Sequence, residues 1–134
     1  MTAALTYVGW PYRAFGRDRS GIDCWGLVRL WLLEQAGIAV ESRDGSDDPA
    51  ELLAASRRSG DWLRVDDQPF IHDLVLMFRP VTGFGFKPWH VGVMATEKLV
   101  LHISTDGRSM CERFAGPSIQ SRIEGVYRHK SRVA

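Results

Sequence analysis

A cysteine stands between an aspartate and a tryptophan where an apolar stretch begins, in the segment SGIDCWGLV at residues 20–28. If a helix starts here, Cys24 lies in its first turn, where the positive end of the helix dipole lowers the pKa of a thiol. The free backbone amides of that turn can stabilise the oxyanion of a tetrahedral intermediate. These features are typical of a nucleophilic cysteine. The alternative is a small buried core residue, since free cysteine is often buried.

A nucleophilic cysteine needs a base, and histidine is the usual one. His90 and His102 fall in two segments, HVGVMA and LVLHIS, that can form a hairpin closing over residues 96–98. A loop of this odd length pairs Gly92 with His102, so the two histidines become diagonal neighbours on one face, about 7–8 Å apart. A two-residue loop would put the rings on opposite faces. The alternative for each histidine is a structural or surface role, which is the commoner one for a histidine in a strand.

The other cysteine and histidines lack such a pattern. Cys111 falls in the strand-like segment MCERF with no histidine nearby, and His72 and His129 flank strands, so structural roles are predicted for them. The chain has two cysteines, no Cys-x-x-Cys pair and no zinc-finger spacing among its four histidines. We therefore expect reduced thiols without a Cys24–Cys111 disulfide, no metal site and no cofactor.

The segment IDCWGLVRLWLLEQAG, residues 22–37, predicts the helix that would position the cysteine. Leucine, valine and tryptophan cover nearly its whole circumference, and a helix that is apolar all round is a buried one. Asp23 can cap the free amides at its start, and Gly37 suits its end. A second, exposed helix is predicted over residues 46–60, with an aspartate cap and a proline in its first turn.

The pattern changes to strands from about residue 72. Short segments rich in β-branched and aromatic residues alternate with turn residues: DLVLMF (73–78), HVGVMA (90–95), KLVLHIS (98–104), MCERF (110–114) and IEGVYRH (123–129). Helices followed by strands predict an α+β domain, with an antiparallel sheet of about five strands packed on the central helix. The glycine- and aromatic-rich stretch VTGFGFKPWH at residues 81–90 is either a mobile wall beside a site or a packed turn.

Length and composition bound the class of protein. The 134 residues predict a single domain, 1–134, and 45% hydrophobic with 25% charged residues is ordinary for a soluble globular protein. The net charge of +1, with scattered basic residues, gives no reason to expect a nucleic acid or an anionic membrane as partner. No apolar run is long enough for a membrane span, and the N-terminal residues lack the pattern of a signal peptide. We therefore expect a chain made in the cytoplasm, without membrane insertion.

Several strings together resemble the NlpC/P60 cysteine peptidase family. VGWPYRAFGRDRSGIDCWGLVRLW, residues 8–31, resembles its opening Gly-x-Pro-Tyr turn followed by Asp-Cys-x-Gly-Leu-Val at the head of a helix. HDLVLMF resembles its Gly-Asp-Leu-Val strand, with His72 replacing the glycine. HVGVMATEKLVLHIS, residues 90–104, resembles its His-Val-Gly-Ile strand and the strand after it. The match runs in the family's order over roughly residues 7–105, and EGVYRH at 124–129 is similar to the last strand of the phage-tail branch.

The resemblance implies a papain-like α+β fold in which Cys24 is the nucleophile and His90 the general base. His102 would orient the imidazole of His90 and stabilise its charged form. Tyr12 would place its hydroxyl near the thiol and help to stabilise the oxyanion. In cell-wall members the aspartate before the cysteine recognises the amine of a stem peptide, which makes Asp23 a candidate for substrate binding.

The substrate implied by the resemblance is the stem peptide of peptidoglycan, commonly cut between D-glutamate and a diamino acid. Many wall-cleaving members have serine after the cysteine, whereas this chain has Trp25. Its bulky ring either reshapes the substrate cleft, which makes it a second candidate for substrate binding, or packs inward.

We expect a hydrolase carried by the tail of a phage or phage-like particle, because no wall-binding repeat and no export signal are recognised. Other tail-tip or baseplate proteins would then be its partners, and the virion its location. One alternative is a structural tail-tip or tail-assembly protein that keeps the fold without hydrolysis, which an intact Cys–His–His set argues against. Another is a CHAP-type amidase, whose glutamine–cysteine motif is absent here.

Overall fold

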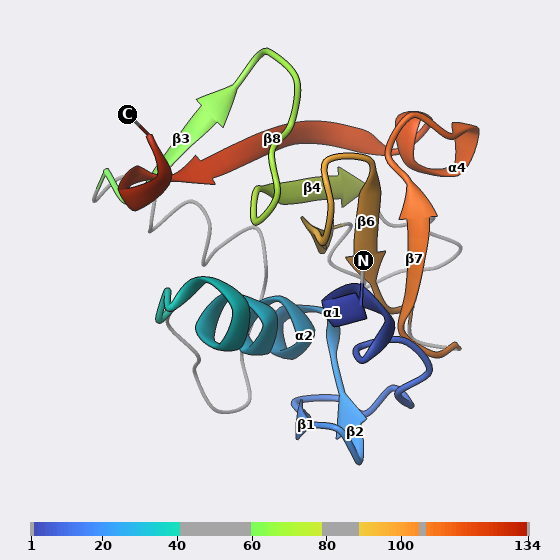
Figure 1. Ribbon diagram of the computed structural model, residues 1–134. Helices are drawn as coiled ribbons and strands as arrows, with labels where there is room; N and C mark the ends of the chain where they lie inside the picture. Colours follow the sequence, from blue (N-terminus) through green and yellow to red (C-terminus); the bar gives the residue numbers. More distant parts are fainter. Residues whose placement is uncertain (1, 41–59, 79–88, 105–106, 134) are drawn as a thin grey trace.

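The structure is a computed structural model that describes residues 2–40, 60–78, 89–104 and 107–133. In chain order its elements are α1 (Thr2–Leu5), β1 (Arg17–Asp18), β2 (Gly21–Ile22), α2 (Cys24–Trp31), a π-helical turn (Leu32–Ala36), β3 (Trp62–Val65), β4 (Leu74–Phe78), β5 (Trp89–Met94), β6 (Leu99–His102), β7 (Met110–Arg113), α4 (Pro117–Gln120), β8 (Ile123–His129) and a 3₁₀ turn (Lys130–Arg132). Figure 1 shows α2 on one side of a twisted sheet, with α1 and the small β1–β2 ribbon close to its first turn.

The main sheet is antiparallel and has the strand order β3-β8-β4-β5-β6-β7 within the described residues. Five of these strands coincide with the predicted segments, and the α+β class with a helix packed on an antiparallel sheet is confirmed. The sixth strand, β3, was not predicted. Its sequence WLRV is short and mixed in polarity, and it forms the edge of the sheet, where Trp62 alone is fully buried.

The helix α2 starts at the predicted residue. Asp23 is its N-cap, and one of its carboxylate oxygens accepts a hydrogen bond from the Gly26 amide at 2.7 Å, which satisfies a helix-end donor that would otherwise lack a partner. The π-helical turn extends the helix to Gly37, whose φ of 67° lies in the left-handed region that glycine adopts without steric cost. The predicted start and end of this helix are therefore confirmed.

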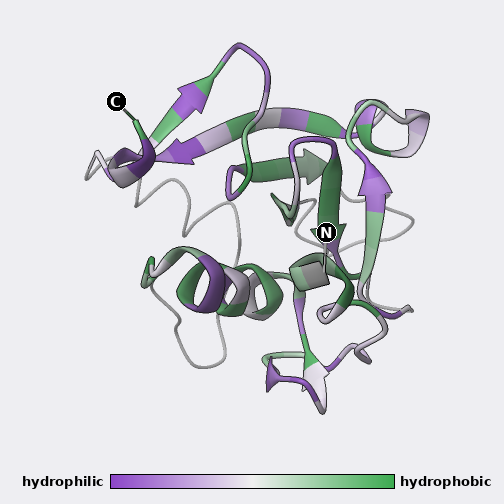
Figure 2. Cartoon of the chain, viewed as in Figure 1, coloured by the Kyte–Doolittle hydropathy of each residue, from purple (hydrophilic) through white to green (hydrophobic). Residues whose placement is uncertain are grey.

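Apolar side chains fill both faces of the sheet. The larger cluster packs α1 and α2 against the strands and includes Tyr7, Leu27, Val28, Trp31, Leu74, Val91, Val93 and Leu101. A smaller cluster on the other face consists of Val75, Met77, Met94, Val100 and Ile119. Figure 2 shows that β4 and β6 are hydrophobic along nearly their whole length. Strands buried on both faces are expected to read as continuous apolar runs.

The β5–β6 hairpin has the register that the odd loop predicts. Val93 pairs with Leu101, and the same register sets Gly92 opposite His102. The amide of Ala95 donates to the carbonyl oxygen of Leu99 at 2.9 Å, so the loop between the strands consists of residues 96–98. Side chains two residues apart on a strand share a face, so this register decides which polar groups meet on the hairpin.

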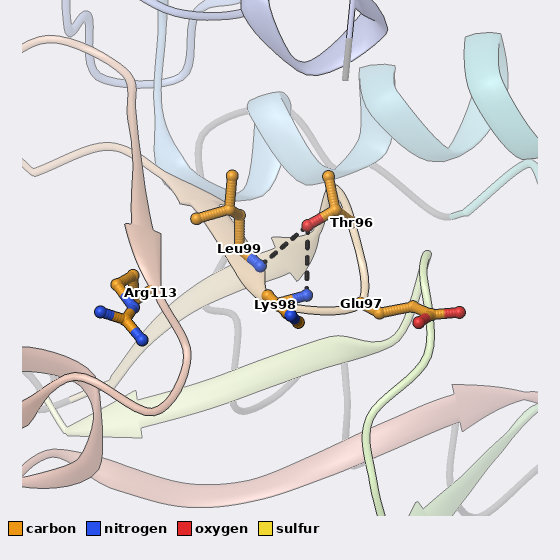
Figure 3. A pocket seen from close by; sticks show the side chains of 5 residues that line it. All are labelled: Thr96, Glu97, Lys98, Leu99 and Arg113. Carbon is orange, nitrogen blue, oxygen red and sulfur yellow. Dashed lines mark hydrogen bonds between the residues drawn. The ribbon is translucent and has the colours of Figure 1, made fainter.

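The turn of this hairpin is closed by a threonine side chain. Oγ1 of Thr96 accepts hydrogen bonds from the amides of Lys98 at 3.1 Å and Leu99 at 3.0 Å, as Figure 3 shows. A pocket of about 660 Å³ lies at this turn, lined by these three residues together with Glu97 and Arg113. It belongs to the end of the hairpin remote from the histidines.

His72 stands where the resembling family has glycine, and it retains a glycine-like backbone. Its φ is 75°, a left-handed conformation that costs a residue with a side chain about 1–2 kcal/mol. The side chain offsets part of this cost, because its Nδ1 accepts a hydrogen bond from the buried indole of Trp31 at 2.9 Å. His129 caps the C-terminal turn by accepting from the Ser131 amide at 3.2 Å. Both contacts are structural, as predicted for these two histidines.

The predicted second helix, 46–60, lies outside the described residues except for its last position, and so does most of the predicted loop at 81–90. In the part of the chain that the structure describes, no helix is long and apolar enough to cross a membrane.

Candidate active site

Cys24 is the first residue of α2, as the sequence predicted. The residue is buried, with 6% of its surface exposed, and it belongs to the core cluster between the helix and the sheet. Neither Cys24 nor Cys111 forms a disulfide, which confirms the expectation of two reduced thiols. The helix start puts the thiol next to backbone amides that no helical carbonyl satisfies.

The carboxylate of Asp23 is shared by several donors. Besides the Gly26 amide, the amide of Phe15 donates to Oδ2 at 3.0 Å, and the guanidinium of Arg17 lies 2.9 Å from Oδ1. These three contacts hold the N-terminal loops against the start of the helix. An ionised carboxylate offers about four acceptor positions. With three of them used by these donors, about one position is left for the predicted contact with a substrate amine. That role of Asp23 stays a prediction.

The imidazoles of His90 and His102 meet on one face of the hairpin. Nε2 of His90 lies 3.0 Å from Nδ1 of His102, and the ring planes are inclined by 73°. The residues are 3% and 2% exposed, respectively. The geometric prediction of two rings within hydrogen-bonding distance is therefore confirmed, and its cause is the loop at residues 96–98.

Glu112 extends this pair, and the sequence reasoning missed it. Oε2 of Glu112 lies 2.7 Å from Nε2 of His102. On β7 it stands opposite Val100, which makes it a diagonal neighbour of His102, just as His102 is of His90. The signal in the sequence was an acidic residue within MCERF. The connection between β6 and β7 is too long to specify a register, so that signal could not be tied to His102.

Burial lowers the pKa of His102 below its ordinary value of 6.5, and the adjacent Glu112 only partly opposes this effect. A buried imidazole with a lowered pKa is neutral at pH 7. The second histidine of the pair is therefore suited to accept or donate a hydrogen bond as a neutral ring rather than to act as a fixed cation.

The remaining two predicted site residues differ in their placement. Tyr12 is half-buried against the core, and its backbone forms a parallel bridge with Ile22, two residues before Cys24. Its turn is thus fixed beside the helix start. Trp25 is 1% exposed and lies wholly within the core. This burial favours the inward-packing alternative for Trp25, and a contact with substrate stays a prediction.

The helix and the hairpin are packed on each other. Val91 of β5 and Leu101 of β6 share the core cluster with Cys24, and in Figure 1 the arrowhead of β6 points toward α1 and the blue, N-terminal end of α2. His90 near the start of β5 and His102 at the end of β6 lie at the same end of the hairpin. Among the described residues no group of three or more potential ligands is arranged to hold a metal ion.

Comparison with known proteins agrees with this architecture. The sequence model of the NlpC/P60 family matches residues 9–128. Proteins of Mycobacterium tuberculosis and Mycobacterium bovis that are named as probable endopeptidases are 32% identical over 107 residues, covering 80% of this chain. The chain spans 23% of the length of these curated relatives.

Two solved structures have the same fold. The NlpC/P60 domain of the peptidoglycan hydrolase SagA superposes with a TM-score of 0.59 at 22% identity, covering 95% of this chain and 93% of that one. A Staphylococcus aureus protein described as similar to a lipoprotein of the NLP/P60 family gives a TM-score of 0.63 at 21% identity, covering 96% of this chain and 39% of that one. The family match over most of the sequence, together with this shared fold, shows that the chain belongs to the NlpC/P60 family.

Proposed function

We propose that this chain is a cysteine peptidase that hydrolyses peptide bonds in the stem peptides of peptidoglycan. The observation that carries the proposal is the buried hydrogen bond of 3.0 Å between His90 and His102, on strands that pack against the helix beginning at Cys24. Membership of the NlpC/P60 family supports it, as do a relative named as an endopeptidase and a similar fold named as a peptidoglycan hydrolase.

In the proposed reaction, His90 takes the proton of the Cys24 thiol. The thiolate sulfur then forms a bond to the carbonyl carbon of the scissile peptide. The tetrahedral intermediate collapses as the C–N bond breaks, and His90 gives its proton to the leaving amine. A water molecule next attacks the thioester, passing a proton to His90, and releases the carboxylic acid while the thiol is restored. His102 holds the ring of His90 and stabilises its charged form during both transfers.

The negative charge of the intermediate falls on the carbonyl oxygen. We assign its stabilisation to backbone amides at the start of α2 and to the hydroxyl of Tyr12, whose turn is fixed beside Ile22. Asp23 orders the same region through its cap and its ion pair with Arg17. In this proposal its remaining acceptor position receives the amine of the stem peptide.

Digestion of purified sacculi tests the proposal. The expected result is release of soluble fragments, and mass spectrometry of the fragments should show new amino and carboxyl ends within the stem peptide. The predicted position is the bond between D-glutamate and the diamino acid. Fragments cut between the sugar and the first amino acid would instead indicate an amidase, and a folded protein that releases nothing would favour a structural role.

Carriage by a phage tail is a finer part of the proposal. Its support is the resemblance of EGVYRH, within β8, to the last strand of the phage-tail branch. In that setting tail-tip or baseplate proteins bring the domain to the wall, and the virion is its location. Mass spectrometry of purified particles from a producing strain should find the chain in the particles. Its absence there, with the chain present in the cells, would contradict this part.

A further inference from the structure

We propose that Glu112 is a positioning residue of the active site, which fixes the tautomer of His102 and, through it, the nitrogen of His90 that accepts the proton. The inference rests on the proposed function, but it concerns a residue to which the family resemblance gives no role. It follows from an unbroken chain of contacts, Glu112–His102–His90, across three neighbouring strands.

The first step concerns His102. Oε2 of Glu112 lies 2.7 Å from Nε2 of His102, and an ionised carboxylate can only accept a hydrogen bond. Nε2 of His102 must therefore carry the hydrogen. In a neutral ring the other nitrogen, Nδ1, is then an acceptor with a free lone pair.

The second step concerns His90. Its Nε2 lies 3.0 Å from that acceptor nitrogen of His102, so Nε2 of His90 must donate. The hydrogen of the neutral His90 ring is therefore on Nε2, and Nδ1 is left with the lone pair. Nδ1 of His90 is the atom that can take the thiol proton. If His102 had the reversed tautomer, its Nδ1–H and the Nε2–H of His90 would be two donors facing each other.

Glu112 is itself held in place. Oγ of Ser118 lies 3.4 Å from Oε2 of Glu112, and the guanidinium of Arg122 lies 3.8 Å from the same oxygen. Ser118 belongs to α4, and Arg122 is the second residue after the end of that helix. These two contacts and His102 all lie against the same oxygen of the carboxylate. The pair of Glu112 and His102 therefore differs from an ordinary surface ion pair, since Glu112 is half-buried and His102 is fully buried.

A spectroscopic test does not depend on hydrolysis. Long-range ¹H–¹⁵N spectra of histidine rings distinguish a protonated Nδ1 from a protonated Nε2, and a Cys24→Ala background prevents proton transfer from the thiol. We expect the Nε2–H tautomer for both His102 and His90, and a mixture of tautomers in His102 after Glu112→Ala is added. An Nδ1–H tautomer of His102 in the background protein, or no change on removing Glu112, would overturn the inference.

Kinetics with intact Cys24 give the second test. Loss of a hydrogen bond to a charged group should lower kcat about 10-fold to 100-fold in Glu112→Ala, with KM unchanged because Glu112 does not touch substrate. Glu112→Gln keeps an acceptor oxygen and should recover part of the loss. Glu124→Ala is the matched control. It removes a carboxylate on β8 that pairs with Arg64 of β3, and two strands, β4 and β5, separate β8 from the strand of His102.

A double-mutant cycle separates positioning from a general effect on folding. In a His102→Gln background the added Glu112→Ala change should cost no further activity, because the residue it acts through is gone. Equal losses in both backgrounds would assign Glu112 a purely structural role. A wild-type protein that leaves sacculi intact would refute the proposed function, while the ring spectra would still decide the role of Glu112.

Discussion

Replacing Gly92 by alanine should damage the histidine pair without touching either ring. A Cβ atom at this position would lie 2.6 Å from Cγ1 of Val100, 3.0 Å from the Leu101 carbonyl oxygen and 3.2 Å from Cβ of His102. Val100 is fully buried, so its methyl group has no free space to enter. The strand β6 must therefore move away from β5, carrying His102 with it.

The size of the effect follows from this overlap. Overpacking a close-packed core costs about 1–3 kcal/mol, and a loss of about 2 kcal/mol lowers the Tm of a chain of this length by roughly 8 °C. Stretching the hydrogen bond between His90 and His102 until it breaks should lower kcat by about 10-fold to 100-fold, since a hydrogen bond to a charged group contributes about 1.5–3 kcal/mol. Thermal denaturation and sacculus hydrolysis measure the two effects separately.

Gly107→Ala is the matched control for Gly92→Ala, because a Cβ at Gly107 would have no atom within 4 Å. This control should retain both the Tm and the activity of the wild type. If Gly92→Ala behaved like the control, the close approach of β5 and β6 would not be what holds the two rings together. Loss of stability with full activity per folded molecule would contradict the link between the strand spacing and the base.

Three further predictions concern other parts of the structure. Asp23→Ala should lower the free energy of unfolding by about 1 kcal/mol or more, because it removes the N-cap; urea denaturation measures this, and an unchanged midpoint would contradict it. The protein should be less stable at pH 5 than at pH 7, because burial lowers the pKa of His72 and His102 below 6.5. As the pH falls below 6.5, the unfolded chain binds more protons than the folded chain, and the stability present above that pH is lost. A denaturation midpoint that rises toward pH 5 would refute the sign. Cys111→Ser should leave hydrolysis unchanged, and alkylation at pH 7 should modify Cys24 first, since burial raises the pKa of the Cys111 thiol; peptide mapping that finds Cys111 labelled first would count against this.

Local signals accounted for what the sequence predicted well. The start of α2 was predictable because Asp23 and the apolar run behind it act within one helical turn, and its end because Gly37 has the left-handed backbone that stops a helix. The hairpin register was predictable because the position and the odd length of the loop at residues 96–98 fix which residues of β5 and β6 pair. The position of His90 beside His102 on one face of the hairpin follows from that register alone.

Non-local contacts limited the rest. Glu112 meets His102 only through the pairing of β6 with β7, and the long connection between these strands specifies no register. The edge strand β3 pairs with β8, more than sixty residues away along the chain, so its short sequence carried little signal of its own. Trp25 could be predicted as buried or exposed with equal reason, because the apolar side chains of α2 leave no polar face to orient the helix.

The most direct test of the central claim is the rate at which purified protein releases stem-peptide fragments from sacculi, measured for the wild type, Cys24→Ala and His90→Ala. All three should be folded, with similar Tm values, so that the comparison reports on chemistry. The account predicts release by the wild type and none above the buffer control by either variant, because nucleophile and base act as one unit. Release by Cys24→Ala at the wild-type rate would contradict the assignment of the nucleophile, and with it the proposed mechanism.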